Sequence, residues 1–140
     1  MKALKMIMSM CLVFVLCGCQ KNEKNDASFE AVSITVTIVD QMTETELFHG
    51  EIHAEGLELT LADVLLANAE TLQLMSEKGT YGLQINGLMG VKTTDWNAGP
   101  WWGYYSENNQ SCVEAGYCDG ASNLKVADGD EFTFTFSTGY

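Results

Sequence analysis

The chain has 140 residues, which suffices for one small domain, and it is strongly acidic. Its seven basic residues are all lysines, and 19 aspartates and glutamates give it a formal net charge of −12. Because no arginine is present to grip phosphate, the composition argues against a protein that binds nucleic acids or other polyanions. The hydrophobic share of 46% excludes a wholly disordered chain.

The N-terminus has the pattern of a bacterial export signal. Lys2 and Lys5 precede an apolar run over residues 6–16, which has the length of a signal-peptide core and is too short to span a bilayer. The run ends in Leu-Cys-Gly-Cys, which resembles a lipobox, so Cys19 is the expected lipidation site. An ordinary secreted protein that is cleaved nearby is the alternative.

This pattern divides the chain into three parts. We expect a lipoprotein signal peptide over residues 1–18, a lipid-anchored flexible spacer over 19–31, and one folded domain over 32–140. The predicted location is the outer face of the cell membrane, and the lipid anchor is the expected membrane contact. Outside the cytosol, the last two cysteines, Cys112 and Cys118, most simply form a disulfide. A metal site would need two further ligands nearby, so none is predicted.

The first half of the folded part shows clear periodicity. Residues 32–38 and 48–55 alternate between apolar and polar residues, which predicts a strand hairpin joined by residues 40–46. His49 and His53 share the polar face, but four strand residues separate them by about 13 Å, too far for one metal ion. Thr-Leu-Ala-Asp at residues 60–63 resembles a capping box and predicts a helix over residues 61–69.

The second half predicts several short strands. Residues 71–75, 81–85 and 101–105 are the candidates, and Asn86-Gly87 is typical of a tight turn. A long irregular segment over 106–123 would hold the disulfide. Asp-Gly-Asp at 128–130 predicts a turn, and three alternating phenylalanines over 132–136 predict a last buried strand. The whole plan is α+β, a mixed or antiparallel sheet with one helix packed on one face.

Five aromatic residues gather in one ten-residue window and form the candidate ligand-binding surface. On the predicted strand 101–105, alternate residues share a face, so one pair of rings packs in the core and the other lies exposed or lines a cleft. The interpretation favours packing for two of the five and leaves binding and packing open for the rest. The candidate residues are Trp96, Trp101, Trp102, Tyr104 and Tyr105.

The order of motifs resembles a family of bacterial surface domains of unknown function that is related to the C-terminal domain of transcobalamin and intrinsic factor. The resemblance rests on four segments that follow in order over roughly residues 33–136. These are Thr-Leu-Ala-Asp-Val-Leu at 60–65, Tyr-Gly-Leu-Gln-Ile-Asn-Gly at 81–87, Trp-Gly-Tyr-Tyr at 102–105 and Asp-Gly-Asp-Glu-Phe-Thr-Phe-Thr-Phe at 128–136. It implies a β-grasp-like domain on an anchored surface protein.

The resemblance also implies a function. In the animal relatives this domain helps to enclose cobalamin, so the expected activity is capture of a small molecule, with a corrinoid such as cobalamin as the candidate ligand, in support of uptake. A transporter or surface-protein partner would complete the pocket. A protein–protein interaction or adhesion module is the alternative, and carbohydrate binding by stacked aromatics stays open. No nucleophile elbow, phosphate-binding glycine loop or free catalytic cysteine is visible, so we expect neither enzyme activity nor a cofactor.

Overall fold

The structure is a computed structural model that describes residues 28–139. The expected signal peptide at 1–18, the lipidation site Cys19 and most of the expected spacer lie outside these residues. The first strand begins at Phe29, a little before the expected start of the domain. No helix within residues 28–139 is long and apolar enough to cross a membrane.

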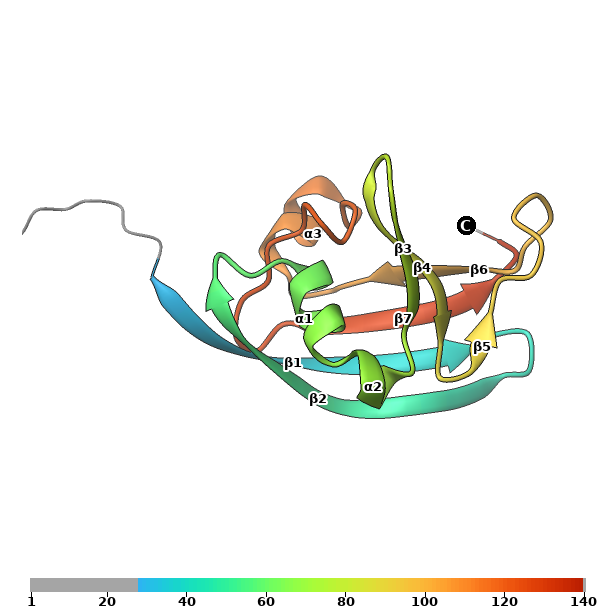
Figure 1. Ribbon diagram of the computed structural model, residues 1–140, viewed down its shortest axis with the longest axis horizontal. Helices are drawn as coiled ribbons and strands as arrows, with labels where there is room; N and C mark the ends of the chain where they lie inside the picture. The colour runs from blue at the N-terminus through green and yellow to red at the C-terminus, as the bar shows by residue number, and fades with distance from the viewer. Residues whose placement is uncertain (1–27, 140) are drawn as a thin grey trace, which may run out of the picture.

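A mixed four-stranded sheet forms the base of the domain (Figure 1). It consists of β1 (Phe29–Asp40), β2 (Thr45–Leu57), β6 (Trp101–Tyr105) and β7 (Glu131–Ser137), in the order β2-β1-β7-β6. β1 pairs antiparallel with β2 and parallel with β7, and β7 pairs antiparallel with β6. The predicted hairpin and the predicted last strand are thus confirmed, and the hairpin strands are longer than their periodic cores.

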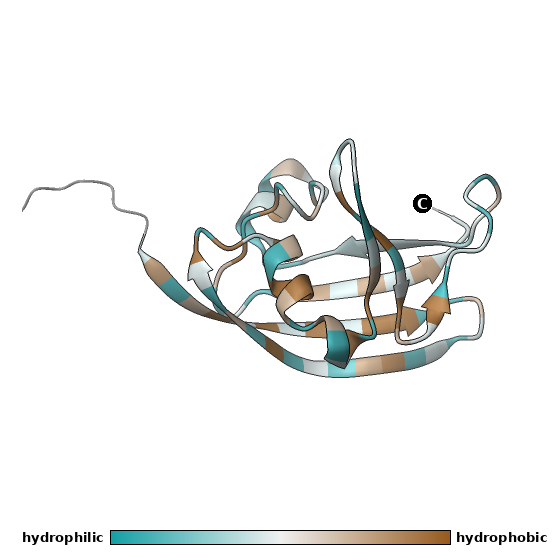
Figure 2. Ribbon diagram, in the orientation of Figure 1, coloured by the Kyte–Doolittle hydropathy of each residue, from teal (hydrophilic) through white to brown (hydrophobic). Residues whose placement is uncertain are grey.

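The alternation along the two central strands determines which face of the sheet is buried (Figure 2). In β1 every second side chain from Val32 onward is fully or almost fully buried, and β7 contributes its three phenylalanines to the same layer. The largest buried side chains of this layer include Ile34, Ile38, Phe132 and Phe134. This apolar layer is the main source of stability, because each such side chain contributes about 1.5–3 kcal/mol on burial.

Two short helices lie over this face. α1 (Leu61–Ala67) begins with the predicted capping box, in which Thr60 accepts a hydrogen bond from the Asp63 amide and the Asp63 side chain accepts one from the Thr60 amide at 2.8 Å. The helix ends two residues earlier than predicted, because the Asn68 side chain donates to the carbonyls of Val64 and His53. After this break the chain continues as α2 (Ala69–Leu72).

A second, three-stranded sheet follows, and it corrects two predictions. It consists of β3 (Met75–Gly79), β4 (Gly82–Leu88) and β5 (Val91–Lys92). The predicted strand over 71–75 is wrong, because its first residues belong to α2 and the polar stretch 76–79, expected between two strands, forms most of β3. Pairing with β4 overrides the weak local preference of these residues.

The predicted turn at Asn86-Gly87 is also wrong, since both residues lie inside β4. The turn is formed instead by Met89 and Gly90, whose φ angles of 51° and 82° suit a two-residue hairpin. Gly87 serves close packing: a Cβ atom there would lie 3.1 Å from the Met75 sulfur. The expected irregular segment 106–123 contains one further short helix, α3 (Gln110–Ala115). The architecture is the single α+β domain that was expected, but within residues 28–139 it has two sheets and three short helices, whereas one sheet and one helix were predicted.

Candidate functional site

The four candidate aromatic residues of β6 separate onto two faces of the main sheet. In β6, Trp102 and Tyr104 point toward the core, where their rings lie 5.0 Å from Phe136 and 5.3 Å from Phe134, centroid to centroid. Trp101 lies on the opposite face of the strand, because neighbouring strand residues alternate. Packing, which the sequence favoured for Trp102 and Tyr104, is therefore their observed environment.

Both inward rings are also held at their polar ends. The indole nitrogen of Trp102 donates to the Val91 carbonyl at 2.9 Å, and the Tyr104 hydroxyl donates to the Asp119 carbonyl at 2.7 Å. Burial, together with the nearby Asp119 carboxylate, raises the pKa of Tyr104 to about 12. These bonds connect β6 with β5 on one side and with the disulfide segment on the other.

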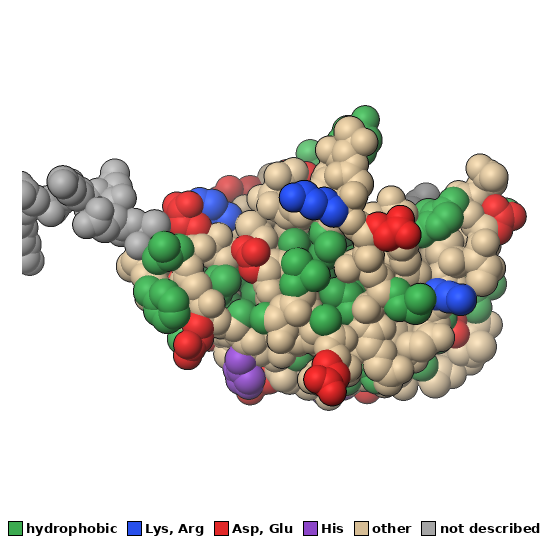
Figure 3. Space-filling model, viewed as in Figure 1, with side chains coloured by type: hydrophobic (Ala, Val, Ile, Leu, Met, Phe, Trp, Pro, Cys, Tyr) green, Lys and Arg blue, Asp and Glu red, His purple; other side chains and the backbone are tan. Residues whose placement is uncertain are grey.

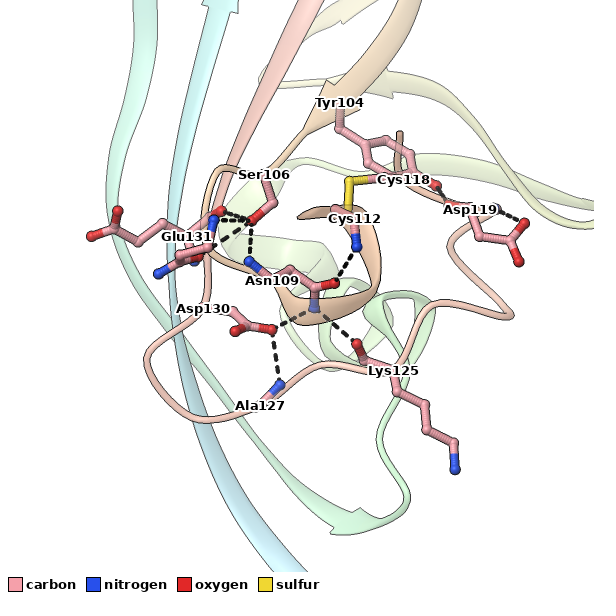
Figure 4. The surroundings of a disulfide bond; sticks show 12 residues. Tyr104, Ser106, Asn109, Cys112, Cys118, Asp119, Lys125, Ala127, Asp130 and Glu131 are labelled. Atoms are coloured by element: carbon pink, nitrogen blue, oxygen red, sulfur yellow. Dashed lines mark hydrogen bonds between the residues drawn. A yellow bond between two sulfur atoms is a disulfide. The ribbon is translucent and has the colours of Figure 1, made fainter. Parts of the chain in front are cut away.

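The disulfide segment, which we define as residues 106–123, lies beside β6 and is bonded to it through the Tyr104 hydroxyl (Figure 4). Asn109 caps α3 by accepting from the Cys112 amide, and Gly116 ends the helix with a φ of 79°. The predicted bond between Cys112 and Cys118 is present. It closes a small ring directly before Asp119. The carbonyl of Asp119 accepts the hydrogen bond from the Tyr104 hydroxyl.

The buried side chain of Asn109 ties this block to the rest of the domain. Its amide group donates to the Lys125 carbonyl at 3.0 Å and to the Asp130 carboxylate at 2.7 Å. Asp130 also accepts from the Ala127 amide, so the segment that leads into β7 is fixed to the same point (Figure 4). The disulfide segment therefore has a defined position relative to the main sheet.

A hollow of about 420 Å³, open to solvent, lies between β6 and the disulfide segment. Because consecutive strand residues point to opposite faces, a hollow that touches four of them in sequence must run along the edge of the strand. We refer to this site as the β6 hollow. Its lining residues are Trp101, Trp102, Gly103, Tyr104, Cys118, Asp119 and Gly120.

The pairing of β7 shows which backbone groups of β6 face the hollow. Asp130 and Phe136 direct their carbonyls to β1, where they accept from the amides of Thr35 and Gln41. The odd-numbered residues of β7 therefore face β6, and Thr135 is directly opposite Gly103. It follows that Trp102 and Tyr104 direct their N–H and C=O groups away from β7, toward the β6 hollow.

The hollow thus combines two kinds of contact. The aromatic residues and Cys118 supply apolar surface, and the backbone of two β6 residues supplies hydrogen-bond donors and acceptors. Among its lining residues Asp119 is the one acidic side chain, and none is basic. Such a surface suits a neutral, partly apolar ligand with polar groups at its rim, and it does not suit an anion.

Two of the predicted residues do not line this hollow. Trp96 lies in the loop before β6 with 46% of its surface exposed, and its carbonyl accepts the indole N–H of Trp101 at 3.0 Å. Tyr105 lines a separate depression of about 120 Å³ with Ser106, Glu107, Glu131 and Thr133. The structure therefore brings Trp101, Trp102 and Tyr104 together with the disulfide segment, and it places Trp96 and Tyr105 elsewhere.

Sequence reasoning missed the contribution of the backbone edge and of the β3–β4 turn. Tyr81 at this turn is 93% exposed, and a Cβ atom on Gly120 would lie 3.8 Å from its carbonyl oxygen. The turn thus reaches the disulfide segment beside the hollow. These segments are far apart in the chain, and no local sequence pattern predicts their contact.

The described part of the chain offers no metal centre. Within residues 28–139 no group of three or more His, Cys, Asp or Glu side chains is placed to hold an ion. His49 and His53 lie on β2, an edge strand, as expected, and the His49 ring shares a hydrogen bond of 2.9 Å with the Thr37 hydroxyl.

Comparisons with known proteins support the fold. A "putative metal binding protein" from Ruminococcus gnavus has a similar structure, with a TM-score of 0.56 and 28% identity over 78% of this chain and 99% of that one. Haptocorrin in complex with Cbi is also similar, with a TM-score of 0.59 and 13% identity over 79% of this chain. The match spans 26% of haptocorrin, so most of that chain has no counterpart in the match. No protein-family model and no curated protein sequence matches the chain.

Proposed function

We propose that this protein is a lipid-anchored, extracytoplasmic binder of a small molecule, that the β6 hollow is its binding site, and that the ligand is a corrinoid captured for uptake. The observation that carries the proposal is the hollow itself. Its volume of about 420 Å³ lies in the range of small-molecule sites, and its wall is held by a disulfide and by the Tyr104 hydrogen bond. A site fixed before binding loses less conformational entropy when the ligand arrives.

Three features favour a corrinoid over other small molecules. A corrinoid has an apolar ring system with amide groups at its rim, which matches the aromatic residues of the hollow and the outward-facing backbone groups of Trp102 and Tyr104. It does not need the arginines that this chain lacks. The likeness to haptocorrin, a corrinoid binder, supplies the third argument.

The hollow is smaller than a whole corrinoid, so it would contact one side of the ligand. A transporter or another surface protein would then cover the other side. The lipid anchor at Cys19, which is inferred from the sequence, would keep the domain near such a partner.

A protein–protein interaction module is the second candidate. Apolar side chains are unusually exposed near the hollow: Tyr81 is 93% exposed, Tyr117 70% and Val113 58%. Exposed aromatic residues of this kind are frequent in the energetic centres of protein interfaces.

The test is a titration of the full-length protein with cobinamide and with cobalamin. Tryptophan fluorescence, corrected for absorption by the ligand, reports binding because Trp101 and Trp102 line the hollow. We expect saturable quenching and a higher Tm with ligand. If neither cobinamide nor cobalamin produced either effect, corrinoid binding by this chain would be refuted and the interaction module would be favoured.

A further inference from the structure

A second hollow lies on the other side of the β3–β4 hairpin, between the hairpin and α1. Its volume is about 500 Å³, and its apolar surface comes from Ala62 and Leu66 of α1 and from Leu83 of β4. Figure 3 shows hydrophobic side chains gathered on this face of the molecule. Leu66 is 51% exposed, so part of this apolar surface is open to solvent. We refer to this site as the α1 hollow.

One wall of the α1 hollow is the free edge of a sheet. β3 is the outer strand of the three-stranded sheet, and three consecutive β3 residues, Ser76, Glu77 and Lys78, line the hollow. As in β6, three consecutive residues can touch one hollow only if the strand edge contributes to it.

The hydrogen bond of the Leu83 amide shows which backbone groups of β3 point out of the sheet. The Leu83 amide donates to the Ser122 hydroxyl at 2.8 Å, so this amide does not bond to β3. Leu83 and Lys78 are directly opposite each other and thus form a pair without mutual hydrogen bonds. Lys78, and Ser76 two residues before it, direct their N–H and C=O groups out of the sheet. Within residues 28–139, neither residue has a backbone hydrogen bond outside its own sheet.

An added strand would place its side chains in the α1 hollow. Ser76, Lys78 and Leu83 line the hollow, so this face of the hairpin looks toward α1. In an antiparallel pair, residues directly opposite each other share a face. The residues of an added strand that bond to Ser76 and Lys78 would therefore direct their side chains toward Leu66 and Ala62.

We propose that an extended segment of a partner protein adds to β3 as an antiparallel strand, with apolar residues at alternate positions in the α1 hollow. Addition of a strand to a sheet edge is an established mode of peptide recognition, in which the main chain supplies affinity and alternate side chains supply specificity. The proposal uses a different surface from the β6 hollow and does not depend on a small ligand.

Charge indicates the chemistry of this partner. Of the charged residues at the hollow, Asp63 and Glu77 are acidic and Lys78 is basic, and Glu77 reaches the hollow through the edge of its strand. The whole chain has a formal net charge of −12. Lysine or arginine beside the apolar residues of the partner segment is therefore favourable, whereas a second copy of this chain would be repelled.

The test uses the peptide acetyl-Lys-Val-Thr-Val-Thr-Val-Lys-amide and two N-methylated forms, one methylated at the valines and one at the threonines. Binding is followed by NMR of the 15N-labelled full-length chain. We expect the amides of Ser76 and Lys78 to shift and to gain protection from hydrogen exchange. The form methylated at the valines should fail to bind, because its blocked amides face β3, whereas the form methylated at the threonines should bind.

Other results would overturn the proposal. Equal binding of both methylated forms would mean that side chains alone make the contact, and no binding of the unmodified peptide would mean that the edge does not accept a strand. Self-association of the chain through the same amides would identify a second copy as the occupant.

Two matched variants test the role of the hollow. Leu66→Glu should weaken peptide binding about tenfold or more, because it puts a carboxylate on the apolar surface. Leu57→Glu, at a residue that is 57% exposed at the end of β2, should leave binding unchanged. Equal effects of the two substitutions would contradict binding in the α1 hollow.

Discussion

Tyr104 connects the aromatic strand with the disulfide segment, and its hydroxyl makes this connection dependent on pH. The pKa is raised to about 12 by burial and by the Asp119 carboxylate, whereas an unfolded chain has a tyrosine pKa of about 10. Folding therefore favours the neutral phenol. The stability that this preference contributes is present below pH 10 and is lost as the pH rises from 10 to 12.

The corresponding prediction concerns Tyr104→Phe. Near pH 8 this variant should be less stable than the wild type by about 1 kcal/mol, the usual contribution of one hydrogen bond. The difference should shrink between pH 10 and 12, since the wild type alone loses the contribution of the phenol. Urea unfolding of both proteins over this pH range measures it. A difference that stays constant would show that the Tyr104 hydroxyl does not titrate in the expected way.

Asn109 is the second residue on which the site depends. It is 3% exposed, and its side chain bonds to the Lys125 carbonyl, the Asp130 carboxylate and the Cys112 amide. Asn109→Ala should lower the free energy of unfolding by about 2–3 kcal/mol, because it leaves a buried carboxylate without one of its donors. The exposed Asn123, changed to alanine, is the control and should alter stability by less than about 0.5 kcal/mol. Denaturant unfolding compares the two, and similar effects would argue against the network.

At the scale of elements, the sequence was informative where one periodicity dominates. The alternation in β1 and the three phenylalanines of β7 each bury one face, and a shift by one residue would expose that whole face. The capping box of α1 was readable for a similar reason, since both of its hydrogen bonds are local. The α+β plan could therefore be predicted from these segments.

The second sheet could not be predicted in the same way. The residues of β3 are mostly polar and exposed, and their strand conformation depends on pairing with β4. The Asn86-Gly87 pair has the composition of a turn, but Gly87 is opposite Lys92 in a sheet and lies close to Met75. The aromatic strand of the candidate site was visible in the sequence. The hollow beside it was not, because it depends on the approach of the disulfide segment.

The disulfide is the element that should determine the shape of the β6 hollow. Its reduction should destabilise the domain by about 2 kcal/mol, because it removes the restraint on a small loop. It should also weaken ligand binding, since Cys118, Asp119 and Gly120 form one wall. Unfolding and titration with and without reductant measure the two effects. The double variant Cys112→Ser with Cys118→Ser should reproduce them, and wild-type affinity in that variant would contradict a structural role of the bond at the site.

At the scale of the molecule, the β3–β4 hairpin stands between two hollows with different surfaces. The β6 hollow offers aromatic residues and the outward-facing backbone of Trp102 and Tyr104. The α1 hollow offers an apolar floor and the outward backbone of Ser76 and Lys78. We infer a domain that can hold a small molecule on one side of the hairpin and a polypeptide on the other.

Isothermal titration with cobinamide tests whether the β6 hollow is the ligand site. The variant Gly120→Leu enlarges a residue that lines the hollow, with its Cβ atom 3.8 Å from the Tyr81 carbonyl oxygen, and Gly139→Leu adds the same side chain where no atom lies within 4 Å of the Cβ atom. With both variants folded to the same Tm, we expect Gly120→Leu to weaken binding at least tenfold and Gly139→Leu to bind like the wild type. Equal affinity of Gly120→Leu and wild type would contradict a ligand site in the β6 hollow.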